Sequence, residues 1–169
     1  EFASLAFVLS PFFKYNLSLL THRNGVVEFT EPEIRIDVGF PQGSENLLFF
    51  DIELKFDDQD FTEHYNRVPL IHYARHEVLE KESRLAVYVR PPKPGAYILS
   101  IYVNATESEV AIACDATETT DNHYKKVCEY RLIAKVSPNA CLSPFPHEGS
   151  DGYGQMEVGL LLLLRFSHF

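Results

Sequence analysis

The amino-acid sequence predicts an all-β fold, built as an antiparallel sandwich of about seven to nine strands. Aromatic residues are frequent, with 13 Phe and 9 Tyr among 169 residues, and such side chains suit the half-buried face of a sheet. Several segments alternate apolar and polar residues with the period of a strand, and turn-forming residues separate them. No apolar repeat is long enough to predict a helix of three turns.

The first strands follow from short apolar runs. Residues 16–21 and 26–29 are apolar segments on either side of Asn24-Gly25. This dipeptide favours a tight turn between paired strands, so the sequence predicts a hairpin here. Residues 34–38 then alternate cleanly and are predicted as the next strand.

The longest predicted strand covers residues 47–56. Asp51, Glu53 and Lys55 alternate in it with apolar side chains, which is typical of a sheet with one face in solvent. The residues predicted to face the core are Leu48, Phe50, Ile52, Leu54 and Phe56.

The second half of the chain continues the pattern. The further predicted strands are residues 68–73, 77–80, 84–90, 96–103 and 127–136. Leu85, Val87 and Val89 are expected inside. A rigid break at Pro91–Gly95 precedes Tyr97, whose hydroxyl is predicted to bond back to the backbone as in a tyrosine corner. The loop 104–126 is long and polar, with one short strand expected within it at Val110–Cys114.

Charge and hydropathy exclude some classes of partner. The net charge is −9 and no basic stripe is present, so we expect no binding to nucleic acid or to anionic membranes. Leu160–Leu164 is far shorter than the roughly 20 apolar residues of a membrane span. A basic protein partner and a metal cation stay open as alternatives.

The cysteines indicate a compartment. Cys114, Cys128 and Cys141 are odd in number and form no metal-type pair. Free thiols in a reducing compartment are the simplest interpretation, and this predicts a cytoplasmic protein. A disulfide between Cys114 and Cys128 stays open as an alternative.

Composition divides the chain into four parts. Residues 138–158 are rich in Pro, Gly and Ser, as linkers are, and residues 162–168 resemble residues 17–22 near the start. The expected parts are 1–13 as the end of a preceding segment or linker, 14–137 as the sandwich, 138–158 as a linker and 159–169 as the first strand of a following repeat.

Several motifs carry a family resemblance. They are Leu19–Val27 with the closing Val38–Pro41, then Arg90–Tyr97, Val127–Arg131, Pro144–Pro146 and Gly152–Gly154. In this order they resemble the immunoglobulin-like repeat of the kyphoscoliosis peptidase and hillarin family of transglutaminase-like proteins, although that family tends to have Trp where this chain has Tyr153. The resemblance implies an immunoglobulin-like sandwich and a larger parent whose cysteine-peptidase triad lies elsewhere. No position here matches the motifs of that triad.

A cysteine nucleophile is the first candidate site. It needs a base within hydrogen-bond reach and a group that orients the base. Asp121, His123 and Cys128 are close in sequence, but Cys128 alternates with Tyr130 and Leu132. We therefore expect a buried structural thiol rather than a catalytic one.

Metal sites are the second candidate. His64, His72, His76 and His123 supply ring nitrogens without a four-ligand zinc spacing. The acidic residues after the long strand are Asp57, Asp58, Asp60 and Glu63. They lack the Gly and terminal Glu of a calcium loop, so a solvated acidic hairpin is the expected structure.

The last candidates are sites of glycosylation and a surface for binding. Asn16 and Asn104 each begin a glycosylation triplet, which matters only in a secreted protein. The loop 104–126 is a candidate interaction surface, and a tolerated insertion is the alternative.

The sequence therefore predicts a module without catalytic, cofactor-binding or metal-binding residues. We expect an interaction or spacer module of a larger, cytoskeleton-associated protein, whose partners are cytoskeletal proteins and the neighbouring domains of the parent chain. Two alternatives stay open, namely a glycosylated extracellular adhesion domain and a fragment that contributes to a cysteine peptidase site.

Overall fold

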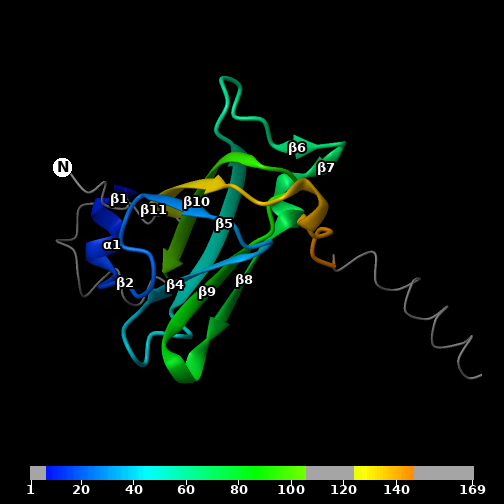
Figure 1. The fold of residues 1–169 in the computed structure, drawn as a ribbon. Helices are drawn as coiled ribbons and strands as arrows, with labels where there is room; N and C mark the ends of the chain where they lie inside the picture. Colours follow the sequence, from blue (N-terminus) through cyan, green and yellow to red (C-terminus); the bar gives the residue numbers. More distant parts are fainter. Residues whose placement is uncertain (1–6, 106–123, 147–169) are drawn as a thin grey trace, which may run out of the picture.

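The computed structural model describes residues 7–105 and 124–146, which form two facing β-sheets (Figure 1). The strands are β1 (Phe7–Val8), β2 (Ser18–Leu19), β3 (Val26–Phe29), β4 (Ile34–Gly39), β5 (Leu48–Phe56), β6 (His64–Tyr65), β7 (Val68–Pro69), β8 (Ala74–Leu79), β9 (Arg84–Val89), β10 (Gly95–Ala105) and β11 (Lys125–Ala134). The helical elements are α1 (Ser10–Lys14) and the 3-10 turns η1 (Leu70–Tyr73), η2 (Glu80–Glu82) and η3 (Pro138–Ala140). The predicted all-β class is confirmed.

The larger sheet has the strand order β1-β11-β10-β5, and β3 also pairs with β11. Its pairings are antiparallel except that of β3, which runs parallel to β11. In the centre, Leu99 of β10 lies opposite Tyr130 on one side and Leu54 on the other. A β-bulge between Ile101 and Tyr102 interrupts the pairing of β10 with β11. The strand β5 pairs with β10 and is the last strand of this sheet among the described residues.

The second sheet has the strand order β2-β4-β9-β8 and is antiparallel. Beyond it, the small hairpin β6–β7 projects from one end of the sandwich (Figure 1). Asn66 and Arg67 form its two-residue turn with positive φ angles of 50° and 68°, the conformation that matches the twist of paired strands.

The core lies between the inner faces of the two sheets. In β5 the inner residues are at most 9% exposed, as the alternation predicts, and Leu85, Val87 and Val89 of β9 are fully buried. Packing of this kind stabilises the sandwich because each sheet hides one apolar face from water.

The hairpin predicted at Asn24-Gly25 is wrong. The strand β2 before it pairs with β4 in one sheet, whereas β3 after it pairs with β11 in the other. A tight hairpin turn needs positive φ angles, and neither Asn24 nor Gly25 has one. The chain crosses from sheet to sheet here instead of folding back.

Two further elements differ from the sequence prediction. Residues 68–73 contain only the two-residue strand β7, and the rest is the 3-10 turn η1. Strand β8 then begins at Ala74, earlier than the predicted residues 77–80, because its pairing with β9 starts opposite Val89. The strand expected at Val110–Cys114 lies outside the described residues.

The first described residues pack against the sandwich. Strand β1 pairs with β11, and the Leu9 amide donates to the Val127 carbonyl at 2.9 Å. Helix α1 follows and buries Phe12. Residues 7–13, predicted as the end of a preceding segment or linker, thus contribute a strand and part of a helix to this fold.

Candidate functional site

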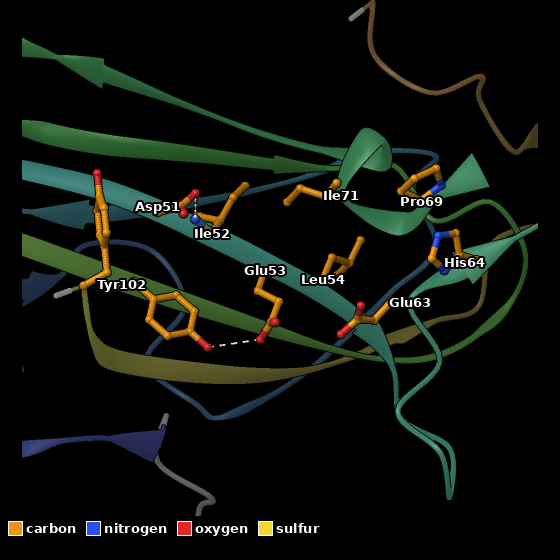
Figure 2. Close-up of a pocket in the computed structure, with 10 residues that line it drawn as sticks. Asp51, Ile52, Glu53, Leu54, Glu63, His64, Pro69, Ile71 and Tyr102 are labelled. Carbon is orange, nitrogen blue, oxygen red and sulfur yellow. Dashed lines mark hydrogen bonds between the residues drawn. The ribbon is translucent and has the colours of Figure 1, made fainter. Parts of the chain in front are cut away.

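A shallow groove of about 400 Å³ runs beside the edge strand β5 (Figure 2). Its lining comes from β5, from the β6–β7 hairpin, from η1 and from β10. The lining residues are Asp51, Ile52, Glu53, Leu54, Glu63, His64, Pro69, Ile71, Tyr102 and Tyr124. Exposed Ile71 and Tyr124 give the groove apolar surface beside its carboxylates.

Several polar groups in and beside the groove are bonded to one another. Lys55 lies 3.0 Å from Glu53 and 3.2 Å from Glu63, and the Tyr102 hydroxyl donates to Glu53 at 3.0 Å. Hydrogen bonds to Glu53 and then Glu63 raise the pKa of Lys55, while burial is the main cause that raises the pKa of Tyr102. The bases among these groups are the Glu53 and Glu63 carboxylates, and both are engaged by Lys55 or Tyr102.

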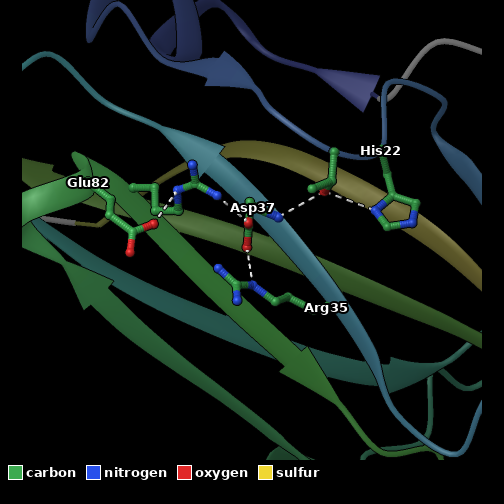
Figure 3. A network of polar contacts seen from close by, with 6 residues as sticks. His22, Arg35, Asp37 and Glu82 are labelled. Atoms are coloured by element: carbon green, nitrogen blue, oxygen red, sulfur yellow. Dashed lines mark hydrogen bonds and ion pairs between the residues drawn. The ribbon is translucent and has the colours of Figure 1, made fainter.

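A second polar centre surrounds Asp37 on the outer face of β4 (Figure 3). Its carboxylate is 4% exposed and accepts from Arg35 Nε at 2.7 Å and from Arg84 Nη1 at 2.9 Å. Glu82 lies 3.1 Å from Nε of Arg84, a contact between charges whose angle makes no hydrogen bond. Burial of a carboxylate is costly, and the two guanidinium groups offset that cost.

The same centre ties the sheet-crossing segment to β4. The Asp37 amide donates to Thr21 Oγ1 at 3.0 Å, and His22 Nδ1 lies 3.0 Å from the same oxygen. Burial lowers the pKa of His22, against a raising effect of Asp37. The His22 carbonyl in turn accepts from the buried Tyr130 hydroxyl at 2.9 Å. This network holds Thr21 and His22 in place where the chain crosses between the sheets.

The tyrosine corner predicted at Tyr97 is confirmed. Its hydroxyl donates to the Lys93 carbonyl at 2.6 Å, and its ring is fully buried beside Phe56 at a centroid distance of 5.0 Å. Burial raises the pKa of this phenol. The residue therefore fixes the proline-rich entry into β10 and has no free polar atom for chemistry.

Cys128 is a core residue, as predicted. It is fully buried on β11 as a free thiol, and burial raises its pKa to about 12. A thiol with this pKa is not ionised at neutral pH and is a poor nucleophile. Asp121, His123 and Cys114 lie outside the described residues, so the structure does not place them relative to Cys128.

The histidines predicted as weak metal candidates are spread over different elements. His64 lies on β6, His72 on η1 and His76 on β8. The His76 residue is exposed by surface area, and desolvation of its ring lowers its pKa against a raising effect of Asp51. In residues 7–105 and 124–146, no three His, Cys, Asp or Glu side chains gather as metal ligands.

The carboxylates of the acidic segment after β5 bind groups of the protein itself. Asp57 pairs with Arg131, and Glu63 pairs with Lys55. Asp58 accepts from the amides of Asp60 and Thr62 at 3.2 and 3.0 Å, and these bonds shape the loop. The carboxylates therefore point to different partners instead of converging as a calcium site would require.

The glycosylation triplets differ in exposure. Asn16 is exposed in a left-handed conformation with φ of 51°, and Asn104 is half-buried near the end of β10. Most of the loop 104–126 lies outside the described residues. Among the described residues, no helix is long and apolar enough to cross a membrane.

Sequence reasoning missed the Asp37 centre. Asp37 stands between Ile36 and Val38 and so predicts an ordinary outward-facing residue. Its partner Arg84 is 47 positions away. Only the pairing of β4 with β9, which sets Gly39 opposite Arg84 and Asp37 opposite Ala86, brings the two charges together.

Comparison with known proteins yields a family and two relatives. A family described as KY-like, immunoglobulin-like domain matches residues 1–146. Hillarin of Drosophila melanogaster is 27% identical over 171 aligned residues, which cover 99% of this chain and 20% of that protein. Lim and transglutaminase domain protein ltd-1 of Caenorhabditis elegans is 25% identical over 99% of this chain and 22% of its own length. The chain thus spans about a fifth of the length of these curated relatives.

Proposed function

The chain belongs to the KY-like, immunoglobulin-like domain family, and from this premise we propose that it is a non-catalytic interaction and spacer module of a larger protein. Membership agrees with the resemblance that the sequence motifs carry. The matching length supports the modular part of the proposal, because the whole chain aligns with about a fifth of each relative.

The observation that carries the proposal is the separation of the reactive side chains. Cys128 is buried in the core, and the four described histidines lie on β6, on η1, on β8 and in the segment between β2 and β3. The described carboxylates mostly bind arginine, lysine or backbone groups. Nucleophilic catalysis needs a thiol or hydroxyl beside a base, with a third group that orients the base. Thr21 and His22 are a hydroxyl beside a base, but the nearby Asp37 carboxylate binds Arg35 and Arg84. We therefore infer a contact role for the described surface.

The groove beside β5 is the proposed contact region. It is open and shallow, it combines apolar side chains with carboxylates, and Asp51 is exposed within it. Such a surface suits a protein partner better than a small substrate, which normally requires deeper enclosure. We propose cytoskeletal proteins in the cytoplasm as the partners, together with the neighbouring domains of the parent chain. The two described free thiols, Cys128 and Cys141, agree with a reducing compartment.

The name of one relative combines LIM and transglutaminase domains. We extend this to the parent of the present chain and propose that a transglutaminase-like domain lies elsewhere in it. The immunoglobulin-like module would then hold that domain against its target.

Binding to purified actin-crosslinking proteins tests the cytoskeletal part of the proposal. The immobilised chain should retain such a protein, and Asp51→Lys should weaken retention because it reverses a charge in the groove. Asp60→Lys is the matched control, since it makes the same change on an exposed loop. If none of the crosslinking proteins is retained, the assignment of partners is wrong. If Cys128→Ala abolishes activity of the parent protein without unfolding it, the non-catalytic assignment is wrong.

A further inference from the structure

The Pro144-Phe145-Pro146 segment lies in the part of the sequence predicted as a linker, yet its central ring packs on the sandwich. Phe145 lies 3.9 Å from the guanidinium carbon of Arg90 and 5.2 Å from that of Arg75, measured to the ring centroid. Its amide donates to the His72 carbonyl at 2.8 Å. The ring and the backbone of one residue thus contact three different residues of the domain.

The backbone contact follows from the composition of the segment. Proline has no amide hydrogen, so Phe145 supplies the only backbone donor of the three residues. A proline after it also disfavours the helical conformation and keeps Phe145 extended. The acceptor belongs to the last turn of η1, where carbonyl groups lack partners within the turn. The amide of Arg90 satisfies the next carbonyl, that of Tyr73, at 2.8 Å.

Each of the two arginines has a further partner besides the Phe145 ring. Arg90 Nε lies 2.6 Å from Glu33, which fixes that side chain across the sheet. The Arg75 guanidinium lies 4.5 Å from the centroid of the Tyr88 ring on the neighbouring strand. A planar guanidinium stacks on an aromatic face, and both arginines also lie close to the Phe145 ring.

We propose that this pair of arginines is a docking site for the Pro-Phe-Pro segment and that it fixes the direction in which the chain leaves the domain at Pro146. The site consists of Arg75, Arg90 and the His72 carbonyl. It holds Pro144–Pro146, a segment with the composition of a linker, against the sandwich. For the larger protein this means a stiff junction, and that meaning rests on the proposed spacer function. The contact itself is tested without any partner.

Distance measurement between two spin labels tests the docking directly. The labels sit on Gln42→Cys, in the loop after β4, and on Ser143→Cys, beside the docked segment, with Cys114→Ser and Cys141→Ser to remove competing thiols. Electron–electron double resonance on the full chain should give one narrow distance. Phe145→Ala should broaden it, and Leu142→Ala, which shortens an exposed side chain in the same segment, should leave it narrow.

Hydrogen exchange at the Phe145 amide gives a second measurement. The amide is protected in the docked state, and Arg90→Lys should raise its exchange rate about tenfold, because lysine keeps the charge but loses the planar stacking. Leu142→Ala should change the rate less than about twofold, since no ring contact is lost. A broad distance distribution in the unsubstituted chain overturns the docking, as does an exchange rate that Arg90→Lys leaves unchanged. Failure to bind a cytoskeletal protein would count against the proposed function and leave this inference standing.

Discussion

Replacement of Asp37 by asparagine tests how the buried carboxylate stabilises the fold. Asparagine has nearly the same volume, but it removes the charge and places an NH₂ donor against one of two guanidinium groups. The side chain is 4% exposed and makes contacts of 2.7 and 2.9 Å to Arg35 and Arg84. Removing a partner from a fully buried ion pair costs about 3–5 kcal/mol, and a hydrogen bond to a charged group contributes about 1.5–3 kcal/mol.

The expected loss is smaller than that of a fully buried ion pair. The side chains of Arg35 and Arg84 are 41% and 33% exposed, so water can solvate them once the carboxylate is gone. We expect Asp37→Asn to reduce the free energy of unfolding by about 2–3 kcal/mol. With a urea slope of about 2 kcal/mol per M, the midpoint should fall by about 1–1.5 M.

Urea unfolding followed by far-ultraviolet circular dichroism measures the change, since the chain has no Trp. Asp60→Asn makes the same substitution on an exposed loop and should stay within about 0.5 kcal/mol of the unsubstituted chain. Arg84→Met alone and combined with Asp37→Asn completes a double-mutant cycle, in which we expect a coupling of at least about 1 kcal/mol. A loss at Asp37 no larger than that at Asp60 would refute the reasoning.

Three further predictions concern single side chains. Tyr97→Phe leaves a backbone carbonyl without its donor and should cost about 1 kcal/mol in urea unfolding, while a loss below about 0.3 kcal/mol would show that the corner contributes nothing. Cys128 should react with a thiol reagent at pH 8 only when the chain unfolds, whereas Cys141 should react in the folded state. Equal reaction rates of the two thiols in the folded chain would contradict the burial of Cys128. Burial lowers the pKa of His22 and His76 in the folded chain. As the pH falls below about 6.5, these two imidazoles are therefore protonated in the unfolded chain before they are protonated in the folded chain. Stability should therefore decline from pH 7.5 to pH 5.5, and His76→Gln should reduce that decline; an equal decline in the variant would exclude His76 as a source.

The sequence could predict those parts of the fold in which one physical signal dominates. Apolar alternation places β5 and β9 correctly to within a residue or two at each end, because every second side chain must enter the core. The proline-rich entry to β10 likewise predicts the bond from Tyr97 to the Lys93 carbonyl. Both signals are local, and neither depends on which strand becomes the neighbour.

The remaining features depend on long-range pairing. Asn24-Gly25 has the composition of a hairpin turn, but the strands beside it find better partners in two different sheets. Asp37 meets Arg84 only after β4 and β9 have paired. Phe145 stands in a segment with the composition of a linker, and its contacts with Arg75 and Arg90 follow from where β8 begins and β9 ends. No window of sequence contains both sides of these contacts.

The motif residues that carry the family resemblance stabilise the fold, and this explains why they identify the family without indicating a binding partner. Thr21 and His22 bond to β4 and to Tyr130 of β11 where the chain changes sheets, and Tyr97 anchors the entry to β10. These are the places that alternation leaves undetermined, so specific side chains are required there for a single topology. Such residues identify the sandwich, but their polar atoms make hydrogen bonds within the fold. Under the proposed function, a partner is recognised by other residues, and the open groove beside β5 offers exposed carboxylate and apolar side chains for that contact.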